Sequence, residues 1–366
     1  MKITVYVPCH NNEKTLPEVL DSLKNQVRPA DEYLFINDRC SDQSPQMAAD
    51  RGFRVLDLIA DYGLAAGRNL AFEYAGGDIL VGIDADVVLE PDFLRELECQ
   101  FDRRAEIAAM CGQLRERYTD TVPDFWRSVH MSQDLGNNEQ LNPHHLFGCT
   151  LACRLAALRS VGGWNSAFRT NYEDVDLSQR LRAAGCNLLY VPGCRAWHLR
   201  QDTLDSVLQG FWKWNYDGPD LAGEFASLEA WASRRLPVLW AIYGAFWQAE
   251  QQARVLSFIT LLMPWSMMIR DLHALRKTVG DVGNLQGLVA LGAGVLARCG
   301  AENGTVAAAV RSLSCLVQSL DAVPAARPAM HPSVLQYIER TALESISGAD
   351  RWKRISDTLR GQMGFP

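Results

Sequence analysis

Two groups of closely spaced carboxylates stand out in the first 200 residues. Asp84-Ala85-Asp86 directly follows the apolar run 79–83, and Glu173-Asp174-Val175-Asp176 precedes a segment with helical periodicity. Two carboxylates that flank one residue at a strand end can share a hard cation such as Mg²⁺ or Mn²⁺, which often bridges to substrate phosphates. A carboxylate of the second group could act as a general base. Both groups also have a structural explanation, because acids occur in solvated loops and compensate helix dipoles.

A histidine further along the chain extends this pattern. His198 lies in Trp197-His198-Leu199-Arg200, shortly after an expected strand and a Pro-Gly turn. An imidazole suits Mn²⁺ as a third ligand without adding charge. A lone histidine is more often a packing residue, so both interpretations stay open from the residues alone.

The elements that must position these residues follow from the alternation of short apolar runs and helical patterns. We expect strands at residues 3–7, 33–36, 53–56, 78–83 and 188–191. We expect helices at residues 15–23, 67–74, 91–101 and 173–184, and a further helix that begins at residue 44. This β-α-β-α order predicts an α/β fold with a mostly parallel sheet and helices on both faces. Ligands bind outside the carboxyl ends of such strands, where Pro8, Asp38 and Asp84 fall.

Three local features complete this expectation. Thr15 and Glu18 have the spacing of a capping box at the start of the first helix. Residues 112–142 are polar and irregular, which predicts a loop-rich crossing. A helix is expected over residues 202–212.

From about Asp202 the composition changes and becomes helical to the end of the chain. We therefore expect a catalytic domain at residues 1–218 and a helical domain at 219–366. Residues 236–249 and 255–269 are strongly apolar. The second run would span roughly 22 Å as a helix, less than the ~30 Å of a bilayer. A buried helical hairpin is favoured over a helix lying on a membrane surface.

Composition excludes some classes of function. The net charge of −7, from 36 basic and 43 acidic residues, argues against a nucleic-acid binder. The ten cysteines include no CxxC pair, so a structural zinc site is not expected. Free thiols and the absence of signal-peptide character favour a cytoplasmic protein. A peripheral position at the inner membrane face, through the C-terminal helices, stays open.

Taken together, several motifs resemble those of family 2 glycosyltransferases of the GT-A fold, in order over the first 200 residues. The matching segments are Val7-Pro8-Cys9-His10-Asn11-Asn12-Glu13, Phe35-Ile36-Asn37-Asp38-Arg39-Cys40-Ser41-Asp42, Gly67-Arg68-Asn69, Asp84-Ala85-Asp86, Gly162-Gly163-Trp164 and Tyr172-Glu173-Asp174-Val175-Asp176-Leu177. The second segment departs from the family pattern at Asn37 and Arg39. Residues 209–214 weakly resemble the Q-x-x-R-W motif of processive relatives but lack its arginine. Processive synthesis is therefore not expected.

The resemblance implies donor-binding and catalytic roles. Pro8, His10 and Asp38 would frame the nucleotide base, and Arg68 would approach the nucleotide or its phosphates. Asp84 would contact the ribose or the metal's water shell. The implied donor is a UDP-, GDP- or dTDP-linked sugar.

The resemblance also implies a metal site and a base. Asp86 and His198, with Asp84, would hold Mn²⁺ or Mg²⁺. Asp174 would be the catalytic base, with Glu173 holding the neighbouring loop. A single displacement by one base implies inversion at the sugar C1.

For the acceptor the implications are weaker. The weak candidates are Trp212, Trp214 and Gly148, and the acceptor would be a glycan, a lipid-linked molecule or a protein. Three alternatives remain: a retaining GT-A enzyme, a non-catalytic member that docks a partner in a glycan-assembly complex, and a nucleotidyltransferase. The last is disfavoured because the chain has Cys9-His10-Asn11-Asn12 where a Gly-rich loop is usual.

Overall fold

The computed structural model describes residues 1–60, 63–215, 225–253, 258–280, 282–298, 301, 303–320, 329–330 and 332–346. The chain divides into two compact units. One comprises Met1–Asp202 and Lys213–Pro219, and the other Thr203–Trp212 and Asp220–Pro366. The expected boundary at residues 218 and 219 lies outside the described residues.

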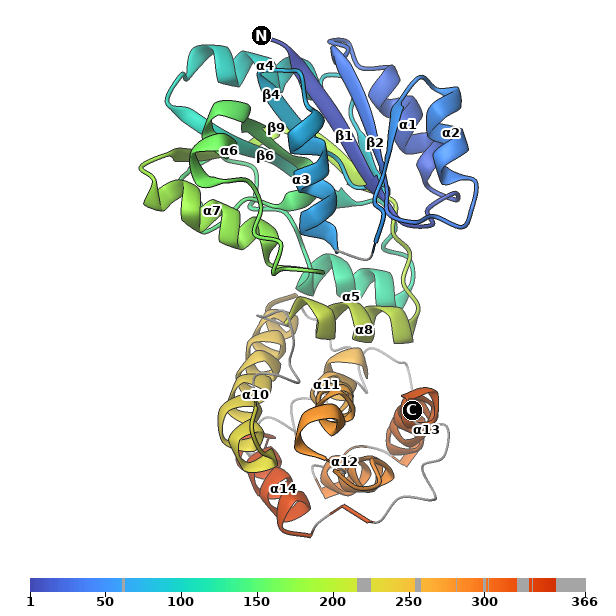
Figure 1. Ribbon diagram of the computed structural model, residues 1–366. Helices are drawn as coiled ribbons and strands as arrows, with labels where there is room; N and C mark the ends of the chain where they lie inside the picture. The colour runs from blue at the N-terminus through green and yellow to red at the C-terminus, as the bar shows by residue number, and fades with distance from the viewer. Residues whose placement is uncertain are drawn as a thin grey trace. The chain divides into compact units, whose positions relative to one another are not determined.

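The first unit is built on a mixed sheet with helices on both faces (Figure 1). Nine strands of the described chain form it, in the order β3-β2-β1-β4-β8-β6-β9-β5, with β7 also paired to β9. The strands are β1 (Ile3–Cys9), β2 (Glu32–Asn37), β3 (Arg54–Asp57), β4 (Ile79–Gly82), β5 (Val87–Leu89), β6 (Ile107–Glu116), β7 (Gln140–Leu141), β8 (Leu151–Arg154) and β9 (Asn187–His198). Its helices are α1 (Leu16–Lys24), α2 (Ser44–Asp50), α3 (Leu64–Tyr74), α4 (Phe93–Arg103), α5 (Val122–His130), the short η1 (Gly148–Thr150), α6 (Leu155–Val161) and α7 (Glu173–Ala183).

The N-terminal half of the sheet has the predicted parallel order. β1 lies between β2 and β4, and β2 pairs with β3, all in parallel. The β1 side chains are almost all buried, which fits a parallel strand covered on both faces. The carboxyl ends of β1, β2 and β4 therefore meet at one edge of the sheet.

The C-terminal half differs from a purely parallel sheet. β8 is inserted antiparallel between β4 and β6, and β5 pairs antiparallel with β9. β9 is longer than the expected 188–191 and continues to His198. Its pairing with β6 shifts register between Gly112 and Gln113. A Cβ at position 112 would stand 2.2 Å from the Cys194 carbonyl oxygen, so only glycine permits this approach.

Two local expectations were wrong. Residues 112–142 are not a loop-rich crossing, because β6 extends to Glu116 and α5 follows, capped by Thr121, whose hydroxyl accepts from the Asp124 amide. Thr15 precedes α1 but does not cap it through its side chain. Its hydroxyl instead donates to the Ala85 carbonyl at 2.9 Å, which ties α1 to the segment between Asp84 and Asp86.

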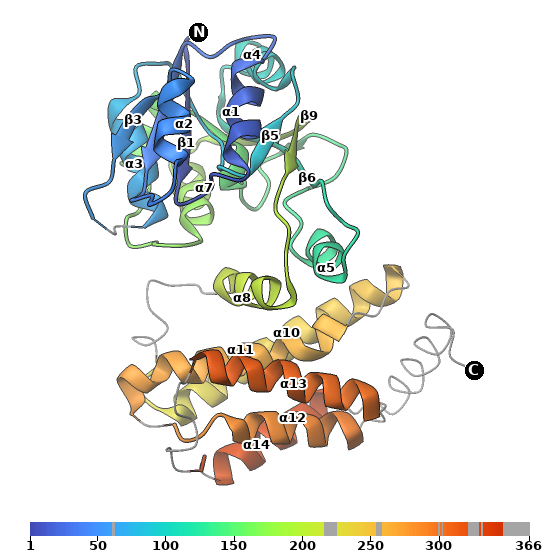
Figure 2. The same cartoon turned by 90° about the vertical axis from the view of Figure 1, so that its right-hand side faces the viewer.

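The second unit is helical, as expected. Its helices are α8 (Leu204–Trp214), of which residues 204–212 belong here, α10 (Leu228–Ala253), α11 (Phe258–Val279), α12 (Gln286–Arg298), α13 (Asn303–Leu320) and α14 (Pro332–Ile346). Helices α11, α12, α13 and α14 lie together in Figure 2. Residues 259–272 of α11 are buried, which matches the buried-helix interpretation of this apolar run. Among the described residues, no helix is both long and apolar enough to cross a membrane.

Candidate active site

The first unit contains a cavity of about 550 Å³ at the carboxyl edge of the sheet. It brings together side chains from α3, the β4–β5 connection, the segment before β8 and the start of α7. The lining residues are Leu64, Arg68, Asp84, Ser132, Gln133, His144, His145, Phe147, Gly148, Cys149, Thr170, Asn171, Tyr172, Glu173, Asp174, Val175 and Trp214.

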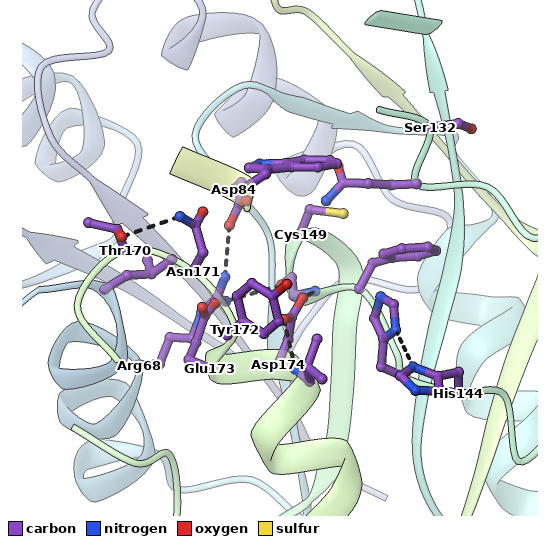
Figure 3. Close-up of a pocket in the computed structure, with 17 residues that line it drawn as sticks. Arg68, Asp84, Ser132, His144, Cys149, Thr170, Asn171, Tyr172, Glu173 and Asp174 are labelled. Carbon is purple, nitrogen blue, oxygen red and sulfur yellow. Dashed lines mark hydrogen bonds and ion pairs between the residues drawn. The ribbon is translucent and has the colours of Figure 1, made fainter. Parts of the chain in front are cut away.

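Arg68 organises one wall of the cavity although it is only 1% exposed. Its Nε donates to Glu173 Oε1 at 3.2 Å, and its Nη2 donates to Asp84 Oδ1 at 3.3 Å. Its Nη1 donates to the Tyr6 hydroxyl and the Gly148 carbonyl, both at 3.1 Å. Figure 3 shows this guanidinium between Asp84 and Glu173. The structure thus gives Arg68 protein partners, and its first role is to join the two acidic motifs.

Two carboxyl groups at this wall have raised pKa values. Burial raises the pKa of Glu173 to about 7, an effect that Arg68 opposes and Asp174 increases. Burial also raises the pKa of Asp84, again opposed by Arg68 and increased by Asp86. A cation bound nearby would favour the charged forms of both carboxyl groups.

Asp174 is held in one orientation by two backbone amides at the start of α7. The Gly148 amide donates to Oδ2 and the Val175 amide to Oδ1, each at 2.8 Å. Tyr172, just before α7, has a left-handed backbone with φ of 68°. Such strained non-glycine residues cluster at functional sites.

Asn69, which follows Arg68, bonds to the backbone of Trp164. Its Nδ2 donates to the Trp164 carbonyl and its Oδ1 accepts from the Trp164 amide, both at 2.8 Å. A Cβ at Gly163 would lie 2.6 Å from Asn69 Oδ1, so the Gly-Gly-Trp motif must present bare backbone here. The two motifs form one clamp between α3 and the segment that leads to α7.

The expected nucleotide-binding residues come together at the ends of β1 and β2. Pro8 pairs with Ile36 across the two strands. His10 Nδ1 lies 2.6 Å from the Asp38 carbonyl oxygen, and the Asp38 amide donates to the Cys9 carbonyl. The Asp38 carboxylate lies 3.2 Å from Arg39 Nε, so Arg39 occupies a position next to the expected base contact.

Asp86 and His198 face each other across the β5–β9 edge. His198 Nε2 lies 3.2 Å from Asp86 Oδ2, and His198 Nδ1 lies 2.9 Å from Glu116 Oε2. Burial lowers the pKa of His198, but Asp86 and Glu116 outweigh it and raise it to about 9. Burial likewise opposes ionisation of Asp86, yet His198 brings its pKa down to about 2.

These residues fit a metal ion that is completed by a ligand. Within the described chain, no three His, Cys, Asp or Glu side chains form a closed cation cage. Asp86 Oδ2 and His198 Nε2 supply an adjacent oxygen and nitrogen, while Asp84 is turned to Arg68. Mg²⁺ is typically held by one or two carboxylates plus substrate phosphates rather than by protein alone. The donor set therefore suits an ion shared with a diphosphate.

The three acceptor candidates do not all lie in the same unit. Trp214 and Gly148 line the cavity. Trp212 belongs to the helical unit, where its Nε1 donates to Asp271 Oδ1 at 2.8 Å, and it is not among the lining residues. A Cβ at Gly148 would lie 2.8 Å from Arg68 Nη2, so this position needs glycine for steric reasons.

Several residues of the site were not predicted from the sequence. His144 and His145 line the cavity and contact each other at 3.2 Å between their Nδ1 atoms. Glu116 and Arg127 lie within the stretch that the sequence suggested was irregular. Nothing in the sequence near Glu116 or Arg127 indicates that the two side chains form an ion pair.

Known proteins share sequence similarity with the first unit. The family described as Glycosyl transferase family 2 matches residues 4–162. The poly-beta-1,6-N-acetyl-D-glucosamine synthase of Staphylococcus epidermidis is 22% identical over 228 residues, which cover 60% of this chain. The match covers only 55% of that relative, so this chain spans about half its length.

Two solved structures illustrate the likeness in fold. The crystal structure of S. aureus TarS 1-349 has 14% identity and a TM-score of 0.45, covering 99% of this chain and 92% of that one. Mannosyltransferase PcManGT from Pyrobaculum calidifontis, in complex with GDP-Man and Mn²⁺, has 15% identity and a TM-score of 0.45, covering 94% and 87%.

Proposed function

We propose that this protein transfers a sugar from a nucleotide-diphosphate donor to an acceptor hydroxyl in glycan assembly, and the match of residues 4–162 to the family described as Glycosyl transferase family 2 supports this. The observation that carries the proposal is the joint placement of Asp84 and Asp174 on one cavity wall, linked through Arg68 and Glu173.

The donor would lie across the carboxyl edge of the sheet. Its base would meet Pro8, His10 and Asp38, and its diphosphate would approach Asp84 and Asp86. A divalent ion bound by Asp86 and His198 would stabilise negative charge on the leaving diphosphate. Arg68 keeps Asp84 and Glu173 in place from beneath.

Asp174 would remove the proton from the acceptor hydroxyl. Two backbone amides fix its carboxylate, so it meets the acceptor without reorienting. Glu173 would hold Arg68 rather than take the proton, because its Oε1 already accepts from the guanidinium. One base and one displacement give an inverted product.

The side chains that line the cavity also indicate the chemical class of the acceptor. Three carboxylates line it, and the one guanidinium among its lining residues, Arg68, is bonded to protein groups. Such a wall disfavours an anionic acceptor. Trp214 and Phe147 offer aromatic faces, and His144, Gln133 and Ser132 offer hydrogen-bonding groups. We therefore propose a neutral sugar hydroxyl as the acceptor.

The test is a panel of UDP-, GDP- and dTDP-sugars with Mn²⁺, read by thermal shift and by release of the nucleoside diphosphate. A binding donor stabilises the folded chain by mass action. We expect Asp86→Asn and Asp174→Asn to abolish nucleotide release, and Asp102→Asn, an exposed acid on α4, to leave it unchanged. Full turnover by both site variants would contradict the proposal.

Two further outcomes of the same panel have separate meanings. NMR of the product anomer distinguishes inversion from retention. A folded chain that binds no nucleotide sugar in the presence of Mn²⁺ would favour a non-catalytic, partner-docking member of the family.

A further inference from the structure

Behind Asp86 and His198 lies a buried chain of charged side chains that the proposed reaction does not use. Glu116 contacts His198, Arg127 contacts Glu116 at 3.3 Å, and Arg127 also contacts Asp202 at 3.3 Å. Arg200 closes the series on Asp202 at 3.1 Å. The side chains of Glu116, Arg127 and Asp202 are at most 7% exposed.

From this arrangement we propose that Glu116 is a positioning residue for the candidate metal ligand His198, and that Arg127 and Asp202 hold Glu116 in place. The inference rests on the proposed cation site at Asp86 and His198. Metal-bound histidines almost always donate their second ring N–H to a carboxylate, a backbone carbonyl or a water, which fixes the ring and its tautomer.

The sheet itself sets the contact between these two residues. Glu116 is the last residue of β6 and is the register partner of His198, the last residue of β9. Its Oε1 and Oε2 lie 3.0 Å and 2.9 Å from His198 Nδ1. With Nδ1–H donated to Glu116, Nε2 is directed to the side of Asp86, where a cation would take the place of the Nε2 proton.

Arg127 reaches this carboxylate from α5. Its Nε lies 3.3 Å from Glu116, its Nη1 lies 3.3 Å from Asp202, and its guanidinium lies 5.8 Å from the Trp214 ring. The Asp202 amide in turn donates to Asp124 Oδ1 of α5 at 2.6 Å. A guanidinium suits this place because its planar fork can bond two carboxylates at once.

The experiment measures Mn²⁺ binding to the full chain by the loss of the free-ion EPR signal, with and without UDP. We expect Glu116→Gln to weaken Mn²⁺ binding about 10- to 100-fold, the usual effect of losing an outer-shell partner. The matched control is Glu90→Gln, because Glu90 accepts from Trp197 Nε1 at 3.3 Å, one residue before His198 on the same strand. This variant should bind Mn²⁺ like the wild type.

Each outcome of the titration either supports or refutes the positioning role of Glu116. Unchanged Mn²⁺ affinity in a folded Glu116→Gln chain, even with a lower melting temperature, would overturn the inference and leave only a structural clamp. No Mn²⁺ binding by the wild type, with or without UDP, would overturn the proposed cation site and this inference with it. If Glu116→Gln does not fold, Glu116→Asp and Arg127→Lys decide by the same titration. Each keeps its charge but changes the geometry, so wild-type affinity in both would refute the role.

Discussion

Replacement of Gly148 by alanine tests the link between the arginine and the proposed base. The new Cβ would stand 2.8 Å from Arg68 Nη2 and 3.3 Å from Glu173 Oε1. Ordinary contact begins near 3.4 Å, so the guanidinium must move by about 0.6 Å. It cannot swing aside, because it is buried and bonded to Glu173, Asp84 and Tyr6. Overpacking of this kind costs about 1–3 kcal/mol.

The same substitution should reduce turnover. The Gly148 amide donates to Asp174 Oδ2, so displacement of this backbone shifts the proposed base. A misplacement approaching 1 Å can lower the rate about 100-fold. We expect a lower urea midpoint for the first unit and a kcat decrease that exceeds any change in KM for the donor.

Gly67→Ala is the control for Gly148→Ala. Gly67 lies on α3 next to Arg68, and its added Cβ would meet Ile36 and Leu58 at 3.5 Å, an ordinary contact. Helix propensity then favours alanine by up to about 1 kcal/mol. Gly148→Ala with wild-type stability and wild-type kcat would refute the steric argument, and an equal loss in Gly67→Ala would show a general intolerance of side chains near Arg68.

Further predictions concern pH and two hydrogen bonds. Since the pKa of Glu173 is raised from 4.5 to about 7 in the folded state, its contribution to stability is present below pH 4.5 and is lost as the pH rises through 7. This contribution amounts to about 3 kcal/mol. Urea denaturation should therefore show a smaller change in unfolding free energy between pH 5 and pH 8 for Glu173→Gln than for the wild type. An equal change in both proteins would exclude Glu173 as the cause. Thr15→Val removes the bond to the Ala85 carbonyl and should lower the unfolding free energy by about 1 kcal/mol, while Thr15→Ser should restore most of it. Asn69→Asp leaves the Trp164 carbonyl without its donor and should cost about 1–2 kcal/mol, whereas an unchanged melting temperature would rule out the clamp.

The sequence predicted those parts of the fold that local patterns specify. Apolar runs followed by polar residues placed β1, β2 and β4 and the ends that carry Pro8, Asp38 and Asp84. Parallel order followed because helical segments separated these strands. The antiparallel insertion of β8 could not be predicted, since its partners β4 and β6 are distant in sequence and only long-range packing selects them.

The same division holds for the candidate site. Asp84, Glu173 and Asp174 could be singled out because acids at element ends are recognisable, and the structure places all three on one cavity. Their connection through Arg68 could not be seen, since it depends on a buried guanidinium from another helix. Glu116 was missed because β6 continues beyond the apolar residues that mark a strand in the sequence.

The segment between β6 and β8 supplies one side of the cavity without contributing a strand to the central parallel pairing. Ser132, Gln133, His144 and His145 all come from it, whereas the donor candidates Pro8 and Asp38 come from β1 and the end of β2. If this cavity receives the acceptor, as we propose, we expect a graft of this segment from one chain to another to change acceptor preference. Arg127 sets the limit of such a graft, because a transplanted segment without it would leave two buried carboxylates facing each other behind His198.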